Sequence, residues 1–266
     1  MGHRYGYACE ENKISNMGSN GRVKLVSTED FKVACTINNL KQEEVLQYFV
    51  DRVSFYAFNG GEMEAVTLWA TSIIIDCKKE VNAEIQAVTD RKVKRVSLKY
   101  ILMLSELNDN PYLSTIDKMK ESFTLMREWE IDMSPLVDYP RDFSLDENHS
   151  LALTFDFNLL CRMNGIEAVQ VLQYFVNNIS MASERAINLI EFVETNSCMS
   201  LFGMMRLSLG DKKNRIPIHQ EIHKWYGEKL LLLDDRLKRE ENLDKRIDVY
   251  RAFYKEWYNS LRKNIN

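Results

Sequence analysis

One stretch of 24 residues occurs twice in the sequence. Residues 31–54 read FKVACTINNLKQEEVLQYFVDRVS, and residues 157–180 read FNLLCRMNGIEAVQVLQYFVNNIS. They align without a gap at an offset of 126, and ten of the 24 positions are identical, including Val45–Val50 against Val171–Val176. Unrelated segments of this length share very few identities, so the repeated stretch predicts an internal duplication.

The likeness continues more weakly downstream, in the same order along both parts of the chain. The matching pieces are Leu68-Trp69 with Leu201-Phe202, Asp90-Arg91-Lys92 with Asp211-Lys212-Lys213, and Arg127-Glu128-Trp129 with Lys255-Glu256-Trp257. We therefore expect four segments. They are a mobile N-terminal tail (1–21), helical repeat unit 1 (22–138), a turn-rich linker (139–147) and helical repeat unit 2 (148–266).

Hydrophobic periodicity predicts helices in both units. The expected helices are 28–38, 41–55, 63–79, 97–107 and 113–133 in unit 1, and 156–164, 166–181, 182–207 in one or two pieces, 218–239 and 243–262 in unit 2. Plausible N-caps are Ser27 or Thr28 in unit 1 and Asp156 in unit 2. Residues 22–26 and 150–155 are extended candidates. We predict an all-α fold of two homologous units packed about a pseudo-two-fold axis, with at most a short two-stranded ribbon.

Composition describes an ordinary globular chain. Of 266 residues, 45% are hydrophobic and 28% charged, which excludes disorder over most of the length. Ten glycines and four prolines are too few for a loop-rich sandwich or a glycine-cradled nucleotide fold. The formal net charge is -4, so a nucleic-acid site would have to be a local patch.

Cysteine usage and apolar runs indicate the compartment. The five cysteines are odd in number, and none lies in a Cys-x-x-Cys motif, which favours reduced thiols in a cytoplasmic protein. The first 21 residues lack the apolar run of a signal peptide. The longest apolar stretch, about residues 65–75, is shorter than the roughly 20 residues that cross a bilayer. We expect a cytoplasmic protein without membrane contact.

Two basic segments at equivalent places in the units are the strongest functional candidates. We predict that they form cationic loops related by the pseudo-axis, which spaced phosphates of a duplex could engage together. Solvated inter-helix loops are the competing interpretation, which the negative net charge supports. The candidate residues are Arg91, Lys92, Lys94, Arg95 and Lys99 in unit 1, and Lys212, Lys213 and Arg215 in unit 2.

The last helix offers an alternative site, for a protein partner. It carries a dense aromatic band that includes Tyr250, Tyr254, Trp257 and Tyr258. Aromatic residues at helical spacing also occur where a helix docks on its own domain. A groove between the two units is a further place for a partner.

Three other motifs lack residues that a functional site would need. His219 and His223 lie four apart on a predicted helix, but no third ligand is close in sequence. Cys35 and Cys161 lie among apolar residues and resemble core cysteines. The strand–helix–helix order resembles that of ribbon–helix–helix regulators, yet it covers only the shared stretch and carries no diagnostic motif, so we assign no family.

The sequence therefore favours a non-catalytic binding or regulatory protein, without metal or cofactor. We expect it to contact nucleic acid through the basic segments, and the alternative is a protein–protein adaptor or scaffold. A small-molecule or enzymatic role would need a polar pocket between the units.

Overall fold

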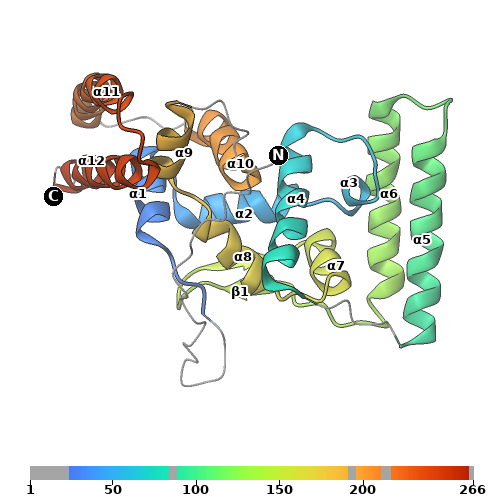
Figure 1. Cartoon of the computed structure of the whole chain (residues 1–266). Helices are drawn as coiled ribbons and strands as arrows, with labels where there is room; N and C mark the ends of the chain where they lie inside the picture. The colour runs from blue at the N-terminus through green and yellow to red at the C-terminus, as the bar shows by residue number, and fades with distance from the viewer. Residues whose placement is uncertain (1–23, 84–88, 191–195, 211–216, 264–266) are drawn as a thin grey trace.

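The computed structural model describes residues 24–83, 89–190, 196–210 and 217–263, and in them the chain is mostly helical with one small sheet (Figure 1). The first half contains α1 (Glu29–Ile37), α2 (Gln42–Arg52), α3 (Phe55–Phe58), α4 (Ala65–Val81), α5 (Arg91–Asp109) and α6 (Thr115–Met133). The strands β1 (Asp142–Ser144) and β2 (Ser150–Ala152) follow. The second half contains α7 (Phe155–Met163), α8 (Ala168–Asn177), α9 (Met181–Asn188), α10 (Ser197–Met205), a π-helical turn η1 (Arg206–Gly210), α11 (Pro217–Leu237) and α12 (Leu243–Lys263).

The two copies of the repeated stretch begin with the same local structure. The Thr28 hydroxyl accepts the Phe31 N–H and caps α1, and the Thr154 hydroxyl accepts the Phe157 N–H and caps α7, both at 3.2 Å. The N-cap of α7 is therefore not Asp156, because Thr154 supplies the side-chain oxygen that the first turn needs. Both helices end in the predicted tight turn, where a residue with positive φ, Asn39 or Gly165, reverses the chain.

The sheet is a two-stranded hairpin inside the expected linker region and the start of unit 2. β1 and β2 pair antiparallel, with Phe143 opposite Leu151. The extended candidate at residues 150–155 is thus confirmed in its first half. Residues 24–26 of the other candidate form no strand, because the Val26 backbone bonds to the Gln173 side chain instead of to a second strand.

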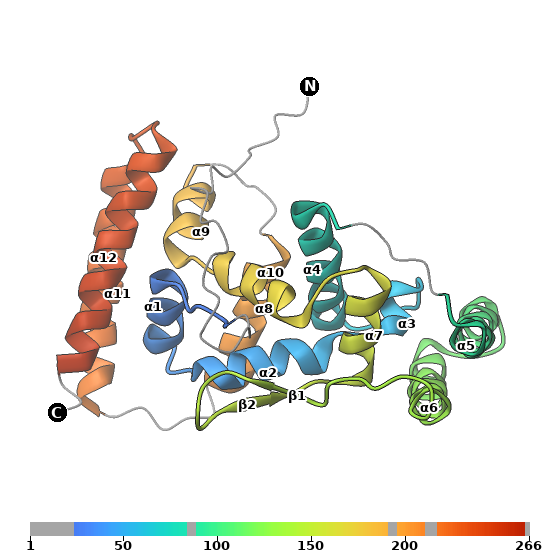
Figure 2. The ribbon, with the colours of Figure 1, turned by 90° about the horizontal axis from the view of Figure 1, so that it is seen from below.

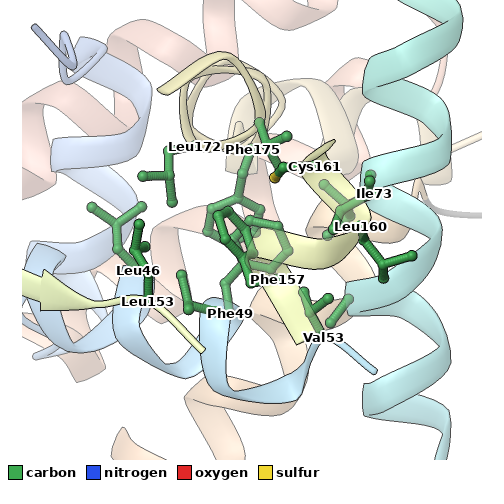
Figure 3. Packing of buried hydrophobic residues seen from close by; sticks show 14 of the residues in the cluster. Leu46, Phe49, Val53, Ile73, Leu153, Phe157, Leu160, Cys161, Leu172 and Phe175 are labelled. Carbon is green, nitrogen blue, oxygen red and sulfur yellow. The ribbon is translucent and has the colours of Figure 1, made fainter. Parts of the chain in front are cut away.

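Phenylalanines from both copies meet at the centre of the core (Figure 3). The rings of Phe49 on α2 and Phe175 on α8 stack with centroids 4.6 Å apart. Phe31 lies edge-on to Phe175, and Phe157 lies edge-on to Phe49. Each of these buried rings stabilises the fold by roughly 1.5–3 kcal/mol. The repeated stretches therefore share one hydrophobic core.

Two long helical hairpins flank this core at opposite ends of the molecule (Figures 1 and 2). The α5–α6 hairpin contacts the core through Trp129, whose ring meets Phe55 and Phe155 edge-on. The α11–α12 hairpin contacts α9 and α1 through α12 and forms a second, smaller apolar cluster there. None of the helices in the described parts of the chain combines the length and apolar content needed to cross a bilayer.

Candidate functional site

The first basic segment is the beginning of a helix rather than a loop. The Asp90 carboxylate accepts the backbone N–H groups of Lys92 at 2.7 Å and Val93 at 3.1 Å, so α5 begins at Arg91. The prediction of a loop up to residue 96 was wrong here, because Asp90 is a good N-cap and satisfies the first turn. These bonds also hold the pKa of Asp90 below its ordinary value.

Four of the five cations in this segment project into solvent. Arg91, Lys92, Lys94 and Arg95 are exposed, and no ion pair joins them to an acidic side chain of the described residues. The charge of Lys92 acts on the nearby Asp90 carboxylate, which the backbone bonds from Val93 and Lys92 already hold. The four cations lie on the first two turns of α5, where the helix dipole is positive and each cation costs on the order of 0.3–1 kcal/mol. Helix stability therefore does not account for this clustering of positive charge.

Lys99, the fifth cation, has a structural partner. Its ammonium group lies 3.2 Å from an Asp132 carboxylate oxygen on α6 and 4.4 Å from the centroid of the Tyr100 ring. The Tyr100 hydroxyl donates to the same carboxylate at 2.8 Å, and this bond, followed by the one from Lys99, lowers the pKa of Asp132. Lys99 thus links α5 to α6 through an ion pair, and it is not part of the candidate surface.

The second basic segment, Lys212, Lys213 and Arg215, lies outside the described residues. The helix that follows it, α11, lies at the end of the molecule opposite to α5 (Figures 1 and 2). A single ligand that touched the beginnings of both helices would have to extend across the core.

The aromatic band of α12 belongs mostly to the core. Tyr250, Tyr254 and Trp257 are buried against α9, α1 and α11, which agrees with docking of the helix on its own domain and leaves these rings unavailable for the alternative, a partner contact. Trp257 stacks on Tyr226 with centroids 5.4 Å apart, and Tyr250 donates to Asp234 at 2.7 Å. Tyr258 alone of the four is half-buried, and its hydroxyl accepts a bond from Arg262.

A small pocket of about 240 Å³ lies where α1 of the first half meets α9 and α12 of the second half. Apolar side chains, among them Val33, Met181 and Tyr254, line part of it, together with charged groups. The charges neutralise one another: Lys255 pairs with Glu29 at 2.8 Å, and Arg251 pairs with Asp30 at 3.3 Å and with Asp248 at 3.2 Å. With its cations and carboxylates already paired, the pocket presents no distinct chemistry to a ligand.

Metal ligation and thiol chemistry find no support in the described residues. No three side chains of His, Cys, Asp or Glu converge in them. His223 lies edge-on to Trp257, with ring centroids 5.5 Å apart. Cys35, Cys77, Cys161 and Cys198 are buried thiols, and burial raises the pKa of Cys77 to about 12, far from an activated nucleophile.

The exposed apolar residues on the outer surface of the α5–α6 hairpin were not predicted from the sequence. Leu98 and Leu102 on α5 and Ile116, Phe123 and Ile131 on α6 are all exposed. A signal was present, since α5 carries apolar residues on two faces, and the Val93–Tyr100–Leu104–Leu107 face already fills the core. A second apolar stripe on one helix predicts a contact beyond the domain.

Comparisons with protein-family models, with curated proteins and with solved structures find no match to this chain.

Proposed function

We propose that the chain is a non-catalytic binding protein, made of two fused copies of one helical unit, that contacts nucleic-acid phosphates through the beginning of α5. The proposal has two parts, an architecture and a contact surface. Each is supported by separate observations.

The duplicated architecture is supported by polar contacts that cross between the two stretches in matching pairs. The Gln47 amide makes two bonds to the Ala152 backbone, both 2.9 Å, and the Gln173 amide makes the same two bonds to Val26, at 2.8 and 2.9 Å. All four residues obey the offset of 126 found in the sequence. A pseudo-two-fold axis that passes between the stacked Phe49 and Phe175 rings would relate these contacts.

The hairpins support the same architecture. Tyr100 stacks on Trp129 with centroids 5.7 Å and planes 9° apart, and Tyr226 stacks on Trp257 at 5.4 Å and 7°. Each tyrosine hydroxyl also bonds to a side chain of the paired helix, Asp132 or Ser260. We infer from this that units 22–138 and 148–266 descend from one ancestor, with residues 139–147 as the connection.

The contact surface rests on one observation: the four exposed cations of α5, Arg91, Lys92, Lys94 and Arg95, form no ion pair among the described residues. Phosphate groups are the ligands that would turn this unfavourable cluster into a favourable one, because each neutralised phosphate releases condensed counterions. By the duplication, Lys212, Lys213 and Arg215 would form the equivalent cluster of unit 2.

The test is binding to a DNA duplex as a function of salt, with the full chain. Changing the four α5 cations to Glu should abolish binding at low salt. Neutralising four phosphate contacts corresponds to a slope of log K against log salt of about -3.6, and this part of the slope should disappear. The matched control changes four other exposed cations, Lys120, Arg127, Lys224 and Arg236, to Glu, with the same change in net charge. Equal loss in both variants, or no binding by the unaltered chain, would rule out the surface.

A second candidate function, binding of a protein partner, is favoured by the exposed apolar residues of the α5–α6 hairpin. In this form of the adaptor hypothesis the partner binds the outer surface of α5 and α6, because the rings of α12 are buried. Leu98, Leu102, Ile116, Phe123 and Ile131 carry that surface.

A further inference from the structure

The outward face of α5 carries a stripe of six exposed residues. Three or four positions separate each from the next, so they lie along one side of the helix. The side that faces α6 and the core carries Tyr100, Leu104 and Leu107 instead. In chain order the stripe is Arg91, Arg95, Leu98, Leu102, Glu106 and Asp109.

Nothing in the described chain covers this stripe. α5 makes its principal contacts with α6 and lies at the outer edge of the molecule (Figure 1). Leu98 and Leu102 are each 53% exposed. Two leucines one turn apart at that exposure lose favourable burial that a partner would supply.

The stripe has a symmetric order of chemical types: cations at its amino-terminal end, leucines at its middle and carboxylates at its carboxyl-terminal end. When two such helices lie antiparallel, cations of each face carboxylates of the other, and the leucines meet. Opposite Arg91 lies Asp109, opposite Arg95 lies Glu106, and opposite Leu98 lies Leu102. A surface that is complementary to itself in this way is what a two-fold contact between identical chains requires.

We propose that α5 is the contact between two copies of this chain, packed antiparallel about a two-fold axis near Tyr100. The arrangement also sets the positive end of each helix dipole beside the negative end of the other. The cations that are unfavourable at the beginning of an isolated α5 thereby gain carboxylates and a negative dipole end. A contact built on one helix per chain is small, so we expect a reversible dimer that salt weakens.

Other occupants fit the stripe less well. An anionic surface that covered the whole stripe would be repelled by Glu106 and Asp109, and an acidic peptide would leave these two carboxylates without a partner. Only a partner with the same charges in reverse order satisfies both ends. The inference does not rest on nucleic-acid binding, although the two surfaces share Arg91 and Arg95. Lys92 and Lys94 lie beside the stripe and not on it.

The experiment is sedimentation velocity of the full chain over a series of micromolar concentrations. The unaltered chain should dimerise, and Leu98→Glu with Leu102→Glu should raise the dissociation constant at least about tenfold, or about 1.4 kcal/mol. Lys92→Glu with Lys94→Glu is the control and should leave dimerisation unchanged while it weakens DNA binding. Failure of the dimer and failure of the DNA surface are thereby separated.

A pair of charge variants keeps the test independent of the leucines. Arg91→Glu with Arg95→Glu makes the stripe wholly acidic, and Glu106→Lys with Asp109→Lys makes it wholly basic. Each variant alone should be monomeric, and an equimolar mixture of the two should form a mixed dimer. The proposal is overturned if the unaltered chain stays monomeric, if either charge variant dimerises as well as the unaltered chain, or if the mixture does not associate.

Discussion

Asp156 should make the protein less stable at neutral pH than at mildly acidic pH. It lies on the first turn of α7, and its carboxylate accepts the Phe55 N–H at 2.7 Å. Burial raises the pKa of Asp156 from its ordinary 3.8 to about 6, against the opposing effect of the Phe55 bond. Between these two pH values the folded chain holds a proton that the unfolded chain has lost, so stability falls as pH rises through this window.

The size of the effect follows from the same values. A rise from 3.8 to about 6 corresponds to about 3 kcal/mol. Because the side chain retains some contact with solvent, we expect roughly 1–3 kcal/mol. Asp156→Asn keeps the oxygen that accepts the Phe55 N–H and carries no charge at any pH. It should therefore stabilise the chain by that amount above pH 6 and leave it unchanged near pH 4.

The assay is urea unfolding of both proteins across this pH range, with the difference in the free energy of unfolding as the readout. The difference isolates Asp156 from the other titrating groups. Asp30→Asn is the matched control, since Asp30 occupies the equivalent place in α1 but accepts bonds from Arg251 and from the Ser180 hydroxyl. That control should lose stability at neutral pH. A difference for Asp156→Asn that is the same at pH 4 and pH 7 would refute the reasoning.

Five further substitutions test the core and its crossing contacts by the same urea assay. Gln47→Ala and Gln173→Ala should each cost about 1–2 kcal/mol, since each amide makes two backbone bonds, and a large inequality would contradict their equivalence. Gly61→Ala places a Cβ 2.4 Å from a tyrosine ring and should cost about 1–3 kcal/mol. Gly203→Ala, inside α10, meets nothing within 4 Å and should stabilise the chain by about 0.5–1 kcal/mol. Phe49→Ala should cost about 3–5 kcal/mol, and retention of full stability would show that the ring is not central to the core.

Most helices could be predicted because periodicity and local stop signals agree. The expected helix at 243–262 is α12 (Leu243–Lys263), and the one at 63–79 is α4 (Ala65–Val81). The helices at 41–55 and 166–181 end earlier than expected, at Arg52 and Asn177. The chain then begins new helices, α3 and α9, which the Ser54 and Ser180 hydroxyls cap, and these two serines are identical in the alignment. Ser54 and Ser180 are therefore N-cap signals in the sequence, and they fall inside the apolar runs that predict one longer helix.

The strand pairing could not be predicted from the sequence. Residues 22–26 and 150–155 have the same extended character, and pairing between them is as consistent with the pattern as a local hairpin. The structure pairs 150–152 with 142–144, because a hairpin closes a much shorter loop at lower entropic cost. Gln173 then satisfies the Val26 backbone that a strand would otherwise have satisfied.

The sequence predicts which residues form the basic segment, but not the secondary structure that carries them. The run of positive charge is enough to single out the cations of α5. That they lie on a helix depends on Asp90 as the N-cap, and a run of basic residues does not by itself predict a helix start. For the aromatic band of α12 the sequence predicts the helix correctly but does not decide whether its rings are buried or exposed. Helical spacing of large rings describes a buried face as well as it describes a docking face, and only the position of α9 and α1 decides between them.

The two proposals for α5 are coupled, and the coupling predicts a result that neither gives alone. Arg91 and Arg95 lie on the self-complementary stripe, so in the dimer Lys92 and Lys94 remain for phosphate. Eighteen residues of antiparallel helix would separate the two beginnings of α5 by roughly 27 Å, so one dimer would present two cationic points. Leu98→Glu with Leu102→Glu should then weaken DNA binding more than Lys120→Gln with Arg127→Gln, which makes the same change in net charge. DNA affinity equal in these two variants would show that the cations act within one chain.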